Sequence, residues 1–128
     1  SAKDRFTALQ SGEVDVLAYA RSLAAGEILS VEDLAAPTEC DALQTPQTWP
    51  INFAVLQARG VRGVVVTRDE VRHAMRVAFE KLHLVVEPGG AAALAAVLAG
   101  KVEPGEATLV TLSGGNVDPQ KYAEIIAG

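Results

Sequence analysis

Hydrophobic residues in this chain gather in short runs and in stripes at helical spacing. The valine-rich run over residues 61–67 predicts a parallel strand that is buried on both faces. Thr67 and Glu70 then fit a capping box, in which a Thr side chain and a Glu side chain satisfy each other's backbone amides. The stripe that follows predicts an amphipathic helix with a buried face of Val71, Ala74, Met75, Ala78, Phe79 and Leu82.

The rest of the pattern predicts further helices and strands in alternation. Helices are expected over residues 3–10, 18–25, 50–59, 89–98 and 119–126, and strands over 14–17 and 108–112, with possible short strands at 41–43 and 84–86. Alternating helices and strands are typical of a parallel sheet with right-handed crossovers. We therefore predict an α/β fold, a single three-layer domain over residues 1–128. It has a small, mainly parallel sheet of about four strands with helices on its faces.

Composition narrows the function classes. The chain has 128 residues, of which 49% are hydrophobic and 21% charged, with a net charge of -5. The basic residues form no patch, so nucleic acid is not an expected partner. Cys40 is the single cysteine, which excludes an internal disulfide and a thiolate metal cluster, and no metal site is expected. Without a membrane-length apolar run or a signal peptide, we expect a cytoplasmic protein with no membrane partner.

The end of the expected strand over residues 108–112 carries the most informative polar residues. It leads directly into Ser113-Gly-Gly-Asn116, which would present a hydroxyl and bare backbone at the carboxyl edge of the sheet. Such an edge is where α/β folds bind ligands. The alternative is a plain strand-to-helix turn, in which Asn116 or Asp118 caps the last helix.

Six segments, in order, resemble one family. They are Arg21–Glu27, Cys40–Leu43, Thr48–Ile51, Asp69–Arg72, Leu84–Gly90 and Leu112–Asp118. From about residue 20 to residue 128 the chain resembles the C-terminal part of fold-type-II pyridoxal-phosphate enzymes, the threonine dehydratase and serine racemase family. Residues 3–17 are instead similar to a helix-and-strand unit of periplasmic amino-acid-binding proteins. We therefore predict two segments, 1–18 and 19–128, of different origin, as in a chimera.

The resemblance implies a cofactor edge. In the family the serine at position 113 meets the pyridine nitrogen, where a neutral hydroxyl can donate to an unprotonated ring nitrogen. The implied cofactor-binding residues are Ser113, Gly114, Gly115, Asn116, Glu87 and Ala42. Relatives often have Gly at the position of Ala42, which weakens the expectation of close backbone approach there. Capping and turn roles for Glu87 and for the 41–43 loop stay open.

The resemblance also implies what is missing. In that family the Schiff-base lysine and the phosphate-binding loop come from an N-terminal portion that has no counterpart here. Lys3 lies in a similar Ser-x-Lys-x-Arg pattern, but it is close to a terminus and is followed by Phe6-Thr7 instead of Gly-Ala. We therefore expect no stably bound pyridoxal phosphate, only weak binding at best, and no catalysis in the isolated chain, with Lys3 as a weak candidate.

Two other functions remain open at this point. One is a pyridoxal-phosphate lyase acting on serine or threonine, completed by a partner chain or by Lys3. The other is a module that binds a small ligand near Ser113 without chemistry. In each case a fragment that has lost neighbouring strands should cover its exposed sheet edge or apolar face, so a homo-oligomer is expected.

Overall fold

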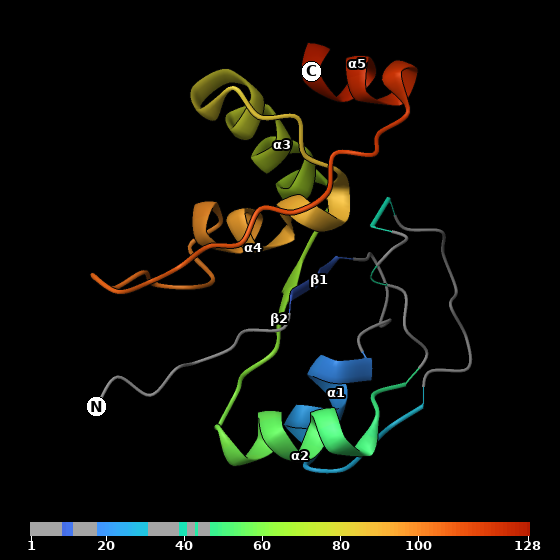
Figure 1. The fold of residues 1–128 in the computed structure, drawn as a ribbon, viewed down its shortest axis with the longest axis vertical. Coiled ribbons are helices and arrows are strands. Elements are labelled where there is room, and N and C mark those ends of the chain that lie inside the picture. The colour runs from blue at the N-terminus through green and yellow to red at the C-terminus, as the bar shows by residue number, and fades with distance from the viewer. Residues whose placement is uncertain (1–8, 12–17, 31–38, 41–42, 44–46) are drawn as a thin grey trace.

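A computed structural model describes residues 9–11, 18–30, 39–40, 43 and 47–128 (Figure 1). The elements are β1 (Leu9–Ser11), α1 (Ala18–Ala25), α2 (Pro50–Ala58), β2 (Val64–Val66), α3 (Arg68–Leu82), α4 (Pro88–Leu98) and α5 (Pro119–Ala127). Helices and a parallel strand pair occur together, so the predicted α/β class is confirmed.

The sheet of the described residues consists of β1 and β2, which pair in parallel with Leu9 beside Val64 and Ser11 beside Val66. About four strands were expected. Residues 84–86 and 108–112 belong to no strand, and Leu43 lies in a turn, its amide donating to the carbonyl of Cys40. The strand expected at 14–17 lies outside the described residues.

Two predictions about these strands are wrong. A helix was expected to reach residue 10, but Leu9 and Gln10 belong to β1, where they pair with Val64 and Val65 of β2. Tertiary pairing here overrides local helix propensity. The run at 61–67 is not buried on both faces, since Val64 and Val66 are buried but Val65 is 43% exposed. Both strands contact α4, and the buried valines belong to the same core cluster as the alanines of that helix.

The helix predicted after β2 is present as α3, and its capping box is confirmed, with the Thr67 side chain accepting from the Glu70 amide. Its buried residues are Val71, Ala74, Met75 and Ala78. Phe79 and Leu82 are 42% and 48% exposed, so the buried stripe is shorter than predicted. Phe79 meets the ring of Tyr122 in α5 edge to face, with 6.0 Å between centroids, and keeps part of its surface in solvent.

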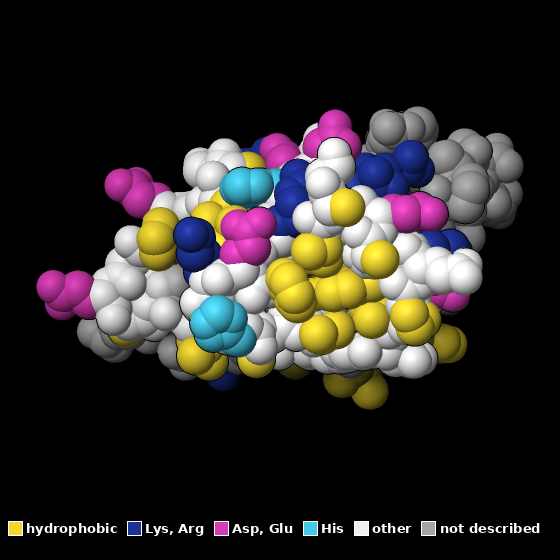
Figure 2. Space-filling view, turned by 90° about the horizontal axis from the view of Figure 1, so that it is seen from above, with side chains coloured by type: hydrophobic (Ala, Val, Ile, Leu, Met, Phe, Trp, Pro, Cys, Tyr) yellow, Lys and Arg dark blue, Asp and Glu magenta, His cyan; other side chains and the backbone are white. Residues whose placement is uncertain are grey.

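The small side chains of α4 allow α3 to pack closely along it, and this pair forms the centre of the core. Seen from above, the side of the molecule that carries α3 and α5 has a patch of apolar side chains bordered by charged ones (Figure 2). His73 on α3 is exposed.

α1 and α2 pack together at the other end of the molecule (Figure 1). Both have the predicted boundaries to within a residue, and Gly26 follows α1 in the left-handed region at φ +77°. Trp49 is the N-cap residue of α2 and is 63% exposed, so it begins a helix and is not part of the core. Cys40 is buried and belongs to the core cluster.

Candidate functional site

The turn Ser113–Asn116 lies against the start of α4. The amide of Glu87, the residue before α4, donates to the carbonyl of Gly114 at 3.0 Å. The amide of Val117 donates to the carbonyl of Gly115, also at 3.0 Å, which closes the turn. All four residues of the turn are exposed. The hydroxyl of Ser113 and the bare glycine backbone therefore face the surface beside a helix N-terminus.

Two glycines make this close approach possible. A Cβ atom on Gly90 would overlap the carbonyl of Ser113, lying 2.7 Å from its carbon. Gly114 has φ +71°, and a Cβ there would lie 2.6 Å from the Glu87 Oε2 atom. The carboxylate of Glu87 thus packs directly over the α-carbon of Gly114. Side chains at either glycine would separate the turn from α4.

Glu87 occupies the N-cap position of α4, before Pro88, yet among the described contacts its carboxylate caps no amide of the helix. It is half-buried and rests on the turn instead. The positive end of the helix dipole stabilises a negative charge at this place. The capping role considered for Glu87 is therefore wrong for its side chain, although its place beside the Ser113 turn agrees with the implied cofactor edge.

The segment before the turn, Thr108–Leu112, is extended but is not a strand, contrary to the prediction (Figure 1). Leu109 is 91% exposed, whereas Leu112 packs against the core cluster. A strand needs a neighbour, and no described segment supplies one here. The sequence carries the strand signal, while the pairing that would satisfy it is absent from the described residues.

The other interpretation of this region, a strand-to-helix turn with a cap, is correct in one detail. Asp118 caps α5, its carboxylate accepting from the amides of Gln120 at 3.0 Å and Lys121 at 2.9 Å. Asn116 does not have this role. Asp118 therefore accounts for the start of α5. The residues Ser113–Asn116 are exposed and are not needed as helix caps.

The structure thus brings together five of the predicted residues, Ser113, Gly114, Gly115, Asn116 and Glu87. Ala42 and Lys3 lie outside the described residues. Sequence reasoning placed Gly90 in a helix and in a segment of family resemblance, but did not identify its contact with Ser113. The signal was a glycine pair inside the first turn of a helix, where glycine is unfavourable unless another backbone approaches.

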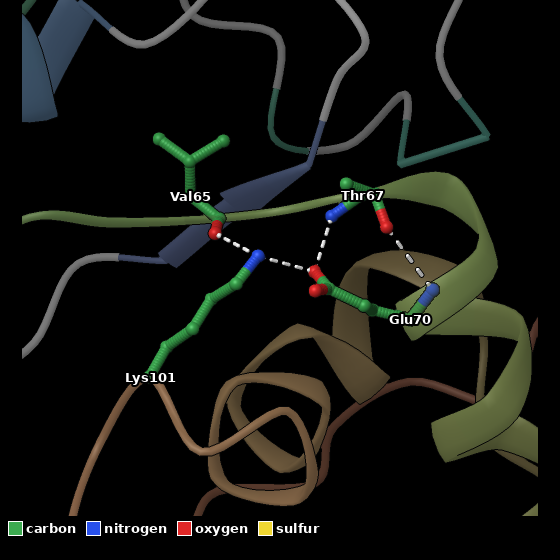
Figure 3. Close-up of polar contacts among 4 residues, drawn as sticks. All are labelled: Val65, Thr67, Glu70 and Lys101. Atoms are coloured by element: carbon green, nitrogen blue, oxygen red, sulfur yellow. Dashed lines mark hydrogen bonds and ion pairs between the residues drawn. The ribbon is translucent and has the colours of Figure 1, made fainter.

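Figure 3 shows a second polar arrangement, in which Lys101 joins the predicted capping box of Thr67 and Glu70; the contacts of Lys101 were not predicted. Lys101 Nζ donates to the carbonyl of Val65 in β2 at 3.0 Å and to Glu70 Oε2 at 2.6 Å. The same carboxylate oxygen accepts from the Thr67 amide at 2.7 Å. Burial alone would raise the pKa of Glu70, but the hydrogen bonds from Lys101 and Thr67 outweigh it and lower that pKa. Lys101 thereby joins the Val65 carbonyl of β2 to the start of α3.

Two arginines of α3 have specific partners. Arg72 forms a two-pronged ion pair with Glu39, and Arg76 donates to the carbonyl of Ile125 at 3.1 Å. The hydrogen bond from Arg72 lowers the pKa of Glu39. These contacts tie α3 to the 39–40 segment and to α5, so they are structural.

No group of three or more metal-ligating side chains occurs within the described ranges. Among the same residues, no helix has the length and apolar character needed to cross a bilayer.

Comparisons with known proteins place the chain in a family. The chain is 29% identical over 109 residues to the serine racemase of Dictyostelium discoideum, and covers 33% of that protein. It is 31% identical over 107 residues to the biosynthetic L-threonine dehydratase of Mycobacterium bovis, and covers 24% of it. These matches take in 83% and 82% of this chain. The chain thus spans a quarter to a third of the length of these curated relatives.

Solved structures of this kind have the same fold. The crystal structure of a T.th. threonine deaminase superposes with a TM-score of 0.74 at 33% identity, over 86% of this chain and 40% of that one. Maize serine racemase gives a TM-score of 0.74 at 26% identity, over 96% and 38%. The profile of the pyridoxal-phosphate dependent enzymes matches residues 5–114 of the 128. The chain therefore belongs to the family of pyridoxal-phosphate dependent enzymes.

Proposed function

We propose that Ser113–Asn116 and Glu87 form the part of a pyridoxal-phosphate site that faces the ring nitrogen of the cofactor. We also propose that these residues do not catalyse a reaction on their own. The observation that carries the proposal is the contact between the Ser113–Asn116 turn and the N-terminus of α4. The bond from the Glu87 amide to the Gly114 carbonyl, with no room for a side chain on Gly90, fixes the serine relative to the glutamate.

The residues present fit such a ring. Ser113 is exposed at the end of an extended segment, and Gly115 offers exposed backbone close to it, while the Glu87 carboxylate covers the α-carbon of Gly114. When bound, pyridoxal phosphate supplies an electron sink that stabilises negative charge on a substrate carbon. The hydroxyl of Ser113 would donate to the ring nitrogen and orient the ring. Glu87 would lie at the ring edge, with its charge stabilised by the N-terminus of α4.

Catalysis of this type needs a lysine whose amine is neutral and held in a dry pocket. Lys81 and Lys121 are exposed, and Lys101 is occupied by Glu70 and Val65. None of these three described lysines meets the requirement. A lyase acting on serine or threonine, as the names of the relatives suggest, would therefore need Lys3 or a second polypeptide to supply the amine.

The chimera hypothesis receives no support from the comparisons. The family match begins at residue 5, and β1 at Leu9–Ser11 pairs with β2 in the sheet. Both observations favour a common origin for residues 5–114. A junction near Ala18–Ala20 stays a prediction.

The test is a titration with pyridoxal phosphate, followed by borohydride reduction and mass mapping of the labelled lysine. We expect weak, saturable binding without a single labelled lysine, with scattered labelling of Lys81, Lys101 and Lys121. Ser113→Ala should weaken that binding roughly fivefold to tenfold, as loss of one hydrogen bond predicts. Thr111→Ala, which removes another exposed hydroxyl two residues earlier, is the matched control and should have no effect.

The other outcomes separate the alternatives. A stable absorbance band with the label on Lys3 alone would establish a catalytic amine and contradict the proposal that the chain is inactive. Binding of serine or threonine without any change in the cofactor spectrum would indicate a ligand-binding module. Equal affinity of wild type and Ser113→Ala would exclude the ring-nitrogen role of Ser113.

A further inference from the structure

Helix α5 begins almost directly after the turn that carries the candidate cofactor residues. A single residue separates the turn Ser113–Asn116 from Asp118, the N-cap residue of α5. The contacts with α4 hold the first half of the turn, through the carbonyls of Ser113 and Gly114. The second half leads into α5, so the place of that helix determines the direction in which the chain leaves the turn.

The place of α5 comes from its contacts with the rest of the molecule. An isolated helix shorter than about 12–15 residues is marginal in water, and α5 has nine. Ile125 is buried in the core cluster, and the ring of Tyr122 meets Phe79 of α3 edge to face. These contacts hold α5 against α3 (Figure 1). A change in α3 can therefore move α5.

Arg76 of α3 fastens the C-terminal end of α5. Its Nη1 atom donates to the carbonyl of Ile125 at 3.1 Å, in a partly buried hydrogen bond. This carbonyl lies in the last turn of the helix, where backbone acceptors lack partners within the helix and the helix dipole is negative. A guanidinium at this place satisfies the acceptor and complements the dipole. Asp118 caps the opposite end, so both ends of α5 are held by a side chain of suitable charge.

We propose that Arg76 is a positioning residue for the candidate cofactor turn. By holding α5 on α3 it fixes the exit of the turn, and with it the orientation of the Ser113 hydroxyl. The inference rests on the proposed function, which assigns the ring of pyridoxal phosphate to this turn. Arg76 acts through the helix, since its partner Ile125 lies 49 residues further along the chain. A turn held at both its entrance and its exit is preorganised, so the cofactor does not have to order it on binding.

The first test needs no cofactor. Arg76→Met keeps the apolar stem but removes the donors, so the amide resonances of Gly115 and Asn116 should shift in two-dimensional NMR spectra of the whole chain. Arg76→Lys, which keeps a cation able to donate to the same carbonyl, should shift them less. Unmoved resonances in Arg76→Met, or equal shifts in both variants, would overturn the inference.

Arg62→Met is the matched control for this test. Arg62 also donates from its guanidinium to a backbone carbonyl, that of Lys101 at 3.4 Å, but beyond the other end of α4. Its loss should leave the resonances of Gly115 and Asn116 in place. Shifts as large as those of Arg76→Met would mean that the turn responds to any such loss, which contradicts a specific role for Arg76.

The second test asks whether the effect reaches the ring of the cofactor. In titrations with pyridoxal phosphate, Arg76→Met should bind about twofold to fivefold more weakly than wild type, as partial loss of one hydrogen bond predicts. The double variant with Ser113→Ala should bind no more weakly than Ser113→Ala alone, because a misplaced turn matters only while the serine is present. A merely structural role would weaken binding by the same factor in both backgrounds and would overturn the inference.

The two tests separate this inference from the proposed function. If Ser113→Ala binds the cofactor as tightly as wild type, the ring-nitrogen role of the serine fails, while shifted resonances in Arg76→Met would still establish that Arg76 holds the turn. If Ser113→Ala weakens binding but Arg76→Met changes neither the resonances nor the affinity, the proposed function stands and the positioning role of Arg76 fails.

Discussion

Gly90 lies so close to the carbonyl of Ser113 that a methyl group cannot fit between them. The contact joins the first turn of α4 to the turn that carries the candidate cofactor residues. Since a Cβ on Gly90 would also lie 3.1 Å from Val86 Cγ1, the obstruction is on two sides. The absence of a side chain at Gly90 thus allows Ser113 to lie against the first turn of α4.

Gly90→Ala should therefore destabilise the fold. Alanine gains about 1 kcal/mol over glycine in a helix interior, but overpacking against backbone costs typically 1–3 kcal/mol and the turn must move as well. We expect a net loss of about 1–2 kcal/mol in urea unfolding. Gly105→Ala is the matched control, because a Cβ at Gly105 meets nothing within 4 Å. If Gly90→Ala unfolds no earlier than Gly105→Ala, the close contact is not maintained in solution.

Much of this arrangement could be predicted from the sequence because local signals determine it. The capping box at Thr67, the proline that begins α2 and the Asp118 cap of α5 each act within a few residues, and all are present. The turn Ser113–Asn116 was also identified from its local composition. These features need no knowledge of distant parts of the chain.

The features that were mispredicted depend on contacts between segments that are distant in the sequence. The 108–112 segment has strand composition, yet a strand also requires a partner with matching register, which composition cannot supply. Val65 lies in a run that suggested burial on both faces, but its exposure depends on which elements cover the sheet. The Lys101–Glu70 pair joins residues 31 apart in sequence, and no spacing rule would have found it.

Glu70 should make the stability of the protein sensitive to acid. Its pKa is lowered from the ordinary value of 4.5 in the folded state, so the folded protein holds the charged form more strongly than the unfolded chain does. The resulting stabilisation is complete above pH 4.5 and is lost as pH falls through the lower, folded-state pKa. Stability should therefore decline below about pH 4.5, in part because Lys101 loses its anionic partner.

Glu70→Gln tests this directly. Glutamine can keep the capping box but cannot be charged, so the variant should lose roughly 0.5–1 kcal/mol at pH 7. The deficit relative to wild type should disappear at acid pH, where the wild-type carboxylate is protonated. Urea unfolding from pH 3 to pH 7 gives both values. Glu80→Gln, an exposed glutamate on the same helix, is the control, and a pH-independent deficit for Glu70→Gln would rule out the ion pair as its cause.

Substitution of Met75 tests how much the packing of α3 on α4 contributes to the stability of the fold. It is 1% exposed and is the largest fully buried side chain of the described residues. Met75→Ala should leave a cavity between α3 and the alanine-rich α4 and cost about 2–5 kcal/mol. The total free energy of unfolding of a 128-residue domain is roughly 6–19 kcal/mol, so this loss is a large fraction of it. Leu109→Ala, at a site that is 91% exposed, should cost under about 0.5 kcal/mol by thermal unfolding at low protein concentration.

The contact between Glu87 and Gly114 can be measured with a double-mutant cycle. Gly114→Ala is unfavourable in two ways, since its φ of +71° disfavours a side chain by about 1–2 kcal/mol and its Cβ meets the Glu87 carboxylate. Glu87→Ala removes the carboxylate but leaves φ unchanged. The double variant should therefore be more stable than the sum of the two single losses predicts, by about 1 kcal/mol or more in urea unfolding. Strictly additive losses would mean that the carboxylate does not rest on Gly114 in solution. In that case Glu87 would be free to turn toward solvent, and its proposed place at the ring edge would have no structural basis.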